Sequence, residues 1–348
     1  MKTQLILTLY SLLIILLSSC DDKPNPKDDI IIPTAVKGAV WIANEGNFQF
    51  GNASLTILDF EKNELYQNVF EKKNGRKLGD VFQSISLIND MAYLVVNNSQ
   101  KIEVCNPATF VSSATIAGFS SPRFILNIND NKAYVSEYYA NAIRIVDLRS
   151  NTIIGSIAMT GWGEEMVLNG EKAYITNVNN QYVLVVNTVT DRIEDSILVG
   201  VFPSSIKKDI MGNIWVLCKG NPAKNEKPSL HKIDPISQQL ARTMVLSNLP
   251  GEATELELNS EKNRLYWIAK NIYTLSAIDT TDNVKELVNG QDKNFYGLGV
   301  NPVNNELYVS NAKDFVQRST IMRYGSNGEF KGEFFGGIIT SHFFFYYP

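Results

Sequence analysis

The chain is poor in the residues that build metal sites and disulfides. Its 348 residues include three cysteines and two histidines. Counting alone therefore excludes a site made of several histidines, and it excludes the His-Glu-x-x-His helix of zinc enzymes. The repeats described below place Cys105 and Cys218 three units apart. A disulfide needs Cα atoms within about 7 Å, so we expect two separate buried thiols.

Several sequence motifs of catalysis and nucleotide binding are also missing. The chain has no Gly-x-Ser-x-Gly elbow, no Walker motif and no dinucleotide-binding glycine pattern. The net charge is −4 and the basic residues are scattered, so nucleic acid is not an expected partner. We expect no catalytic residues, no metal ligands and no required cofactor. One enzymatic alternative stays open, a calcium-dependent hydrolase, because carboxylates gather near the starts of several predicted strands: Glu164, Glu165, Glu252 and Glu255.

What the chain does contain is a repeat. An aromatic residue recurs inside a short hydrophobic frame at intervals of 52, 41, 40, 41, 51 and 42 residues. Each unit of about 40 residues holds short runs rich in β-branched and aromatic residues, bounded by Asn, Asp, Gly or Ser, which is typical of strands and turns. Such a period predicts an all-β fold, a seven-bladed β-propeller with four-stranded blades. The recurring residues are Trp41, Tyr93, Tyr134, Tyr174, Trp215, Tyr266 and Tyr308.

Within each unit we name the strands a to d from the central axis outward, with the recurring aromatic on strand b. Asp or Asn is expected at the end of strand c in six units, where its side chain accepts hydrogen bonds from the following turn. These positions are Asp59, Asn106, Asp147, Asn187, Asp234 and Asp279.

The first unit has no strand a of its own. The chain instead ends in the apolar run 341–347, which has no later partners. We expect this C-terminal strand to return to the first blade and close the ring, because closure removes open sheet edges. Residues 38–348 are thus predicted to form one propeller domain.

The N-terminus has the pattern of an exported protein. Residues 1–19 form a signal peptide, with Lys2 followed by a short apolar stretch and small residues. Leu17-Ser18-Ser19-Cys20 is similar to the lipobox of bacterial lipoproteins, so Cys20 is the predicted lipidation site. The charged, Pro-containing segment that follows, within residues 20–37, is predicted to be a flexible tether.

The loops indicate where a ligand binds. The connection between strands b and c is lengthened in the first, fifth and seventh units. In a propeller these loops share one face with the d-to-a connections, and loops on a rigid scaffold commonly carry binding sites. Aromatic and amide side chains on that face suit a large, partly apolar, amide-rich ligand or a sugar. The candidate ligand-binding residues are Phe48, Asn97, Arg123, Tyr138, Tyr139, Trp162, Glu165, Asn179, Asn180, Phe202, Tyr296 and Phe315.

The segment Trp41-Ile42-Ala43-Asn44-Glu45-Gly46-Asn47-Phe48, together with Asn52-Ala53-Ser54-Leu55-Thr56 and the repeats, resembles the YncE-type propeller lipoproteins of gut bacteria. Within that group the chain is similar to the BtuG lipoproteins, which capture cobalamin and pass it to a TonB-dependent transporter. The resemblance implies a monomeric lipoprotein of the outer membrane, facing the cell exterior, that binds cobalamin or a related corrinoid and partners with such a transporter. The alternative is a surface propeller that binds a glycan or a protein.

Overall fold

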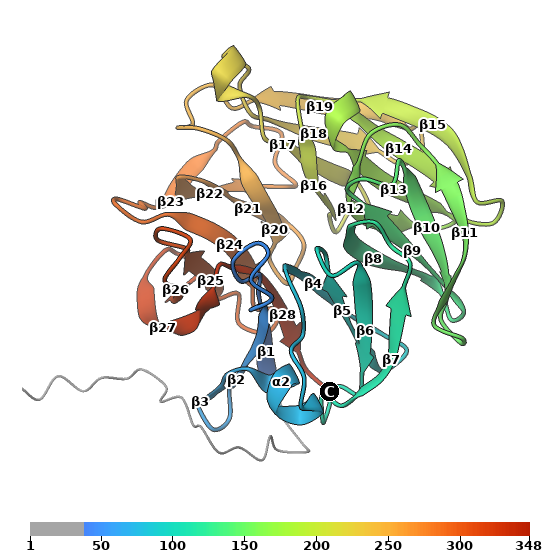
Figure 1. The fold of residues 1–348 in the computed structure, drawn as a ribbon. Helices are drawn as coiled ribbons and strands as arrows, with labels where there is room; N and C mark the ends of the chain where they lie inside the picture. Colours follow the sequence, from blue (N-terminus) through green and yellow to red (C-terminus); the bar gives the residue numbers. More distant parts are fainter. Residues whose placement is uncertain (1–37) are drawn as a thin grey trace, which may run out of the picture.

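The computed structural model describes residues 38–348, which fold into seven four-stranded antiparallel sheets arranged as the blades of a propeller. The predictions for Cys20, the signal peptide and the tether lie outside these residues. In Figure 1 the inner strands surround the middle of the molecule and the outer strands lie at its periphery. The predicted fold class is confirmed.

The strands follow the predicted order in each blade. Strand a is β28 (Thr340–Tyr346), β4 (Phe82–Ile88), β8 (Pro122–Asn129), β12 (Gly163–Asn169), β16 (Pro203–Lys208), β20 (Thr254–Leu258) and β24 (Phe295–Val300) in blades one to seven. Strand b is β1 (Ala39–Asn44), β5 (Met91–Val96), β9 (Lys132–Glu137), β13 (Lys172–Asn177), β17 (Ile214–Cys218), β21 (Arg264–Ala269) and β25 (Leu307–Asn311).

The two outer strands complete each blade. Strand c is β2 (Ser54–Asp59), β6 (Lys101–Cys105), β10 (Ala142–Asp147), β14 (Tyr182–Asn187), β18 (Ser229–Asp234), β22 (Asn271–Ser276) and β26 (Arg318–Tyr324). Strand d is β3 (Glu64–Tyr66), β7 (Ser112–Ala117), β11 (Thr152–Ala158), β15 (Arg192–Leu198), β19 (Gln239–Val245), β23 (Lys285–Val288) and β27 (Phe330–Ile338). Helical segments are short: α2 (Val69–Asn74), η1 (Val178–Asn180) and η2 (Pro222–Lys224).

The C-terminal strand closes the ring as predicted. β28 pairs antiparallel with β1, with Ala39 opposite Tyr346 and Trp41 opposite Phe344. The Trp41 ring stacks on Tyr346 with 4.5 Å between ring centroids. On its two other sides β28 contacts β24 and β4, so the ring of inner strands is continuous.

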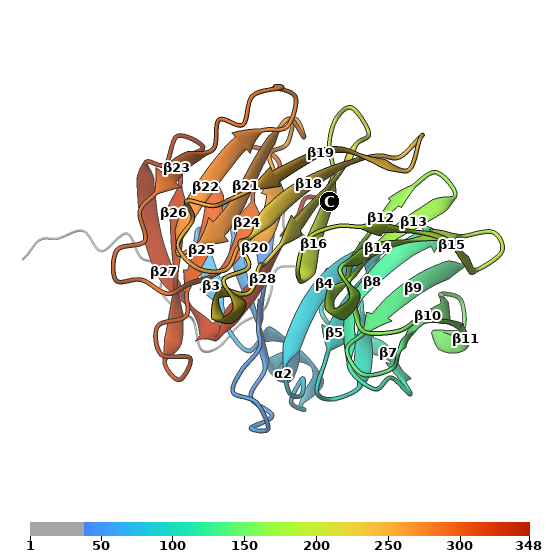
Figure 2. The ribbon, with the colours of Figure 1, turned by 90° about the horizontal axis from the view of Figure 1, so that it is seen from above.

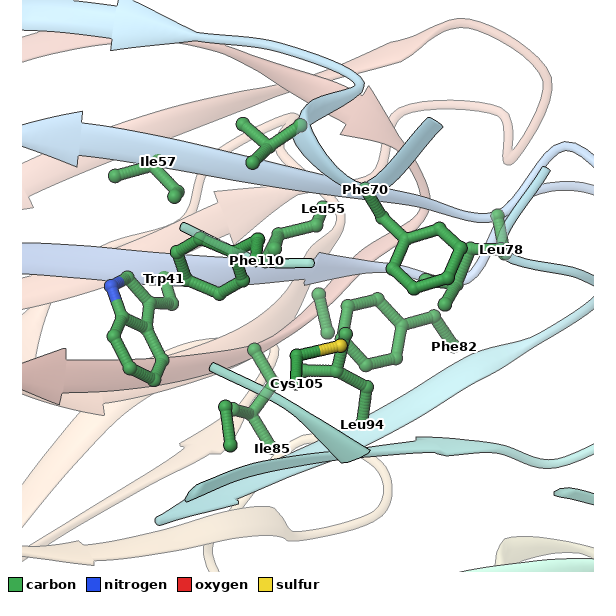
Figure 3. Close-up of a cluster of buried hydrophobic side chains, with 14 of the residues drawn as sticks. Trp41, Leu55, Ile57, Phe70, Leu78, Phe82, Ile85, Leu94, Cys105 and Phe110 are labelled. Atoms are coloured by element: carbon green, nitrogen blue, oxygen red, sulfur yellow. The ribbon is translucent and has the colours of Figure 1, made fainter. Parts of the chain in front are cut away.

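The hydrophobic core lies between the blades. Seven clusters of buried residues each join one blade to the next, and the recurring aromatics of strand b are all buried in them. Figure 3 shows the cluster between the first two blades, where Trp41 and Phe110 meet edge to face and Phe70 of α2 packs beside Phe82. In Figure 2 the blue loop between β1 and β2 projects beyond the blades. Stacking of sheet on sheet thus supplies the burial that no single blade could provide.

The predicted Asx turns are found in five of the six blades. The side chains of Asp59, Asn106, Asp147, Asn187 and Asp234 each accept a hydrogen bond from the backbone N–H two residues on. The prediction for Asp279 is wrong, because β22 ends at Ser276. A one-residue turn at Lys270, with φ of 63°, joins β21 to β22. Strand c of this blade therefore begins and ends earlier in the sequence than the spacing predicts.

Both remaining cysteines, Cys105 and Cys218, are buried free thiols, as predicted. Burial raises the pKa of each thiol to about 12, which keeps both protonated and unreactive at neutral pH. No helix within residues 38–348 combines the length and apolar character needed to cross a membrane.

Candidate functional site

A cavity of about 670 Å³ lies at the centre of the propeller and is lined by all seven inner strands. Each inner strand begins at the face of the propeller that carries the b-to-c loops. In six blades a backbone N–H just after strand b donates to a carbonyl just before strand a, for example Lys219 to Phe202 and Ala312 to Asn294. The three lengthened loops therefore surround the same mouth, as predicted.

The second residue of every inner strand is polar and lines this cavity. We call these seven residues the polar ring. They are Gln83, Arg123, Glu164, Ser204, Glu255, Tyr296 and Ser341.

A β-bulge at each position explains the ring. The pairing of strand a with strand b skips the second residue in every blade, as between Pro203 and Ser205 or between Thr254 and Glu257. Side chains normally point to alternate faces along a strand. A bulged residue interrupts this alternation, so its side chain points in a different direction from the one that regular pairing would give. Seven bulges at one level thus present seven polar side chains to one cavity.

Blades two to four bind one another through the ring. The Arg123 guanidinium donates from Nε and Nη2 to the Glu164 carboxylate, with an Nη2–Oε1 distance of 2.5 Å, and from Nη1 to Gln83 Oε1. Burial alone would lower the pKa of Arg123, but Glu164 and Glu45 outweigh it and the pKa is raised. Arg123 is therefore a fixed cation that holds three neighbouring blades together.

The ring also makes a contact with the loop after β1. Tyr296 donates its hydroxyl to Glu45 Oε1 at 3.1 Å. Burial raises the pKa of the Glu45 carboxyl, and Arg123 opposes that effect only in part. Burial and the Glu45 carboxylate also raise the pKa of Tyr296, which remains a hydrogen-bond donor at neutral pH.

A second charged group lies deeper in the cavity. Lys207 Nζ is 3.2 Å from Glu165 Oε2 and 3.2 Å from Glu257 Oε1, so one ammonium serves two carboxylates. Glu165 also accepts the backbone N–H of Ile206. The two carboxylates overcome the effect of burial and raise the pKa of Lys207.

Glu255 differs from the other cavity acids. Within residues 38–348 its carboxylate forms no hydrogen bond and no ion pair, and its backbone adopts the left-handed conformation, with φ of 58°. Burial, followed by the nearby Glu165 carboxylate, raises its pKa to about 8. Its charge is therefore the least compensated in the cavity.

Two further cavity groups lack hydrogen-bond partners among the described residues: Ser204 Oγ and His342 Nδ1. Burial lowers the pKa of His342 to about 4, so its ring is neutral at physiological pH. Unsatisfied buried polar atoms are rare in native proteins, and they mark places where a ligand or water completes the structure.

An aromatic group lies on the loops of blades three and four. The ring of Tyr138 is 4.0 Å from that of Trp162 and 4.3 Å from that of Tyr139, of which 72% is exposed. Trp162 Nε1 donates to Glu164 Oε2 at 2.7 Å, which ties this aromatic group to the polar ring. The structure thus brings together three predicted residues and connects them to the cavity.

A second aromatic group lies on blades one and seven. Tyr296 meets Phe315 edge to face at 5.5 Å. Asn47 donates its side-chain amide to the carbonyl of Phe315 and so joins the two lengthened loops. Phe48, next to Asn47, is 62% exposed.

The remaining predicted residues have different surroundings. Asn97 and Asn180 use their amide groups within the fold, donating to the carbonyls of Pro122 and Thr160. Phe202 is half-buried before β16, and Asn179 is exposed in η1. Of the twelve predicted residues, the cavity is lined by Arg123, Glu165 and Tyr296.

Several cavity residues were not predicted as ligand contacts. The sequence indicates Glu164 and Glu255 only as carboxylates of a possible hydrolase, and it does not single out Gln83, Ser204 or Ser341. All five occupy the second position of an inner strand, which becomes apparent only when the strand bounds of the seven blades are known. Glu252, the fourth carboxylate considered, is exposed. Within residues 38–348 no group of three or more His, Cys, Asp or Glu side chains is placed to hold a metal ion.

Residues 37–348 match the model of a domain of unknown function, DUF5074. The chain belongs to the DUF5074 family. No curated protein matches it.

Solved structures with a similar fold share little sequence with this DUF5074 chain. One is a quinonprotein alcohol dehydrogenase-like protein from Bacteroides thetaiotaomicron, with a TM-score of 0.69, 15% identity, and coverage of 89% of this chain and 78% of that one. Another is a functionally unknown protein from Desulfotomaculum acetoxidans, with a TM-score of 0.69, 11% identity, and coverage of 90% and 99%. A protein from Lactobacillus plantarum has a TM-score of 0.67 and 11% identity, with coverage of 89% and 99%. At these identities the likeness shows the fold alone.

Proposed function

We propose that this protein is a binding propeller that captures a ligand on its loop-rich face and performs no chemistry on it. The observation that carries the proposal is the mouth itself. An aromatic group lies beside a polar cavity: Tyr139 is exposed, Tyr138 and Trp162 are half-buried, and Trp162 donates a hydrogen bond to the cavity lining. Flat apolar faces next to fixed polar groups are typical of small-molecule sites.

Cobalamin or a related corrinoid is the first candidate ligand. Its size and many amides suit a wide mouth lined by aromatic rings, and the segment from Trp41 to Phe48 supports the assignment through its resemblance to corrinoid-capturing lipoproteins. In this proposal Cys20 carries the lipid, the protein faces outward from the outer membrane, and it delivers its ligand to a TonB-dependent transporter.

The test is a thermal-shift titration of residues 38–348, which contain the whole closed ring, with cyanocobalamin. A ligand that binds only the folded state stabilises it by about 2.7 kcal/mol at a hundredfold excess over Kd. Tyr139→Ala and Phe48→Ala are expected to reduce the shift without loss of fold, because both side chains are exposed. Phe330→Ala, which removes an exposed ring from outer strand β27, is the matched control. No shift at saturating cyanocobalamin would reject the corrinoid.

A second candidate function rests on the loops of blades one and seven. Phe48, Phe50 and Val316 are exposed there, and the bond from Asn47 to Phe315 holds the two loops together. Exposed apolar side chains gathered on one patch are typical of protein docking surfaces. Capture of a membrane transporter by the wild-type protein but not by Phe48→Ala, with no corrinoid shift, would favour this function over ligand capture.

A further inference from the structure

Charged side chains of both signs line the cavity. Five are carboxylates, Glu45, Glu164, Glu165, Glu255 and Glu257, and five are cations, Arg123, Lys207, Lys208, Lys219 and Lys262, so the formal charges balance. Lys208 and Lys262 lie at the end of β16 and in the turn after β20, away from the loop-rich mouth. The arrangement of the charges, and not their sum, therefore decides where a charged ligand would bind.

Among these carboxylates, Glu255 is the one that has neither a hydrogen bond nor an ion pair within residues 38–348. Glu164 is paired with Arg123, and Glu165 and Glu257 share Lys207. Glu255 has no such partner within the described chain; Lys219 and Lys207 attract it from nearby, against the repulsion of Glu165 and Glu257. An added cation in direct contact with Glu255 would supply an ion pair that no described residue forms with it.

An independent observation marks the same place. Ser204 is 5% exposed, lines the cavity, and its hydroxyl has no hydrogen-bond partner among residues 38–348. It occupies the polar-ring position of β16, which contacts β20, the strand of Glu255. The ring is thus hydrogen-bonded through blades two to four and unpartnered in blades five and six. A buried hydroxyl without a partner destabilises the free protein, and a bound donor would remove that penalty.

We propose that the cavity binds an organic cation, a primary ammonium or guanidinium group, between Glu255 as its counter-ion and the hydroxyl of Ser204. The N–H donors of such a group match one carboxylate and one hydroxyl acceptor. A metal ion does not fit as well, since it needs more oxygen ligands than these two. The site is separate from the corrinoid proposal and does not depend on it.

The test is isothermal titration of residues 38–348 with 1,4-diaminobutane and with n-butylammonium, using butan-1-ol as the uncharged probe. Both amines are expected to bind and the alcohol is not. Glu255→Gln is expected to weaken amine binding at least about tenfold, whereas Glu252→Gln, which removes one exposed charge from the segment just before β20, leaves it unchanged. Ser204→Ala is expected to weaken it by a smaller factor. Equal binding by wild type and Glu255→Gln would overturn the proposal.

The pH dependence separates two roles for Glu255. The groups that face it are Glu165 on β12, Lys207 on β16, Lys219 after β17, Glu257 on β20 and Tyr296 on β24. A cation requires the ionised carboxylate, so amine affinity should rise on the order of a hundredfold from pH about 6 to pH about 9. Affinity that falls over this range would mean that the protonated acid donates a hydrogen bond instead, and the proposal fails. Binding of calcium chloride that depends on Glu255 would also overturn it in favour of a metal site.

Discussion

The bulged position of each inner strand decides the chemistry of the cavity. Taken one at a time, most of these side chains are of types that are common on protein surfaces. What distinguishes them is that all seven line the same level of one cavity. Arg123 and Glu164 neutralise each other, whereas Glu255 sits on a left-handed backbone beside other carboxylates. Left-handed backbone in a non-glycine residue is itself unfavourable and is concentrated at functional sites. Arg123 and Glu164 thus stabilise the fold, whereas Glu255 is unfavourable in the free protein and a bound ligand could relieve this.

Replacement of Glu255 by Gln should stabilise the free protein in alkali. The folded pKa of about 8 lies above the ordinary value of 4.5, so the folded state holds the proton more tightly than the unfolded state. The penalty for the carboxylate grows as pH rises from 4.5 and is complete above about pH 8. We expect a higher Tm for Glu255→Gln at pH about 9 and little difference at pH about 4.5, measured by calorimetry. A pH-independent difference would contradict this assignment.

Which of these residues can be predicted from sequence depends on residue type. Arg123, Glu165 and Tyr296 were found because charged and aromatic side chains stand out near a strand start. Ser204 and Ser341 do not stand out, and their exposure to the cavity follows from bulges that no local pattern announces. The missing hydrogen bond of Ser204 could not be predicted at all, because it depends on where every neighbouring side chain lies in the folded protein.

The connections between blades carry part of the stability. The helix α2 is short and would not form alone in water. It is held by Phe70 in the first inter-blade cluster and by Arg76, whose guanidinium forms two 2.8 Å bonds to the Glu103 carboxylate of β6. Ser112 and Thr115 of β7 also donate to Glu103. A buried carboxylate thus joins a connection to two strands of the next blade.

Glu103→Gln should destabilise the protein by about 3 kcal/mol at neutral pH, since it breaks a buried ion pair. Burial would raise the pKa of Glu103, but its bonds to Arg76, Lys101 and Ser112 outweigh that effect and lower it to about 2. The stabilisation is present above pH 4.5 and is lost as pH falls toward 2. Urea unfolding at pH about 7 and about 3 should show the difference shrinking in acid. Glu194→Gln, in an exposed pair with Lys172, is the control and should change stability by less than about 1 kcal/mol.

The repeat predicted the strands well and their turns less well. Aromatics such as Trp215 and Tyr266 located strand b correctly in every blade, because a buried inter-blade position constrains residue type strongly. The error at Asp279 came from a turn. Strand c of the sixth blade starts immediately after Lys270, and a fixed spacing from the aromatic cannot reveal so tight a reversal.

The closed ring makes the whole molecule one cooperative unit. Each inner strand contacts the next, and β28 provides the last link. Truncation after Thr340 removes nearly all of β28, with the ring of Phe344 and the stacking of Tyr346 on Trp41. We expect residues 38–340 to lose the single sharp thermal transition of the intact domain and to aggregate, since β1 becomes an open apolar edge. A truncated protein that melts like the full ring in circular dichroism would show that closure is dispensable.

The closure in blade one also fixes how the domain would respond to force. β1 and β28 run antiparallel, so the described chain begins and ends on the same side of one blade, with Ala39 opposite Tyr346. A pull on the two ends in opposite directions would load the hydrogen bonds of this pair one after another, as a zipper opens, rather than all at once in shear. An N-terminal anchor alone would not load the hydrogen bonds between β1 and β28, because force would act on β1 and not on β28. We therefore expect the pairing of β1 with β28 to open first when both ends of the domain are pulled, whereas attachment by one end leaves it intact.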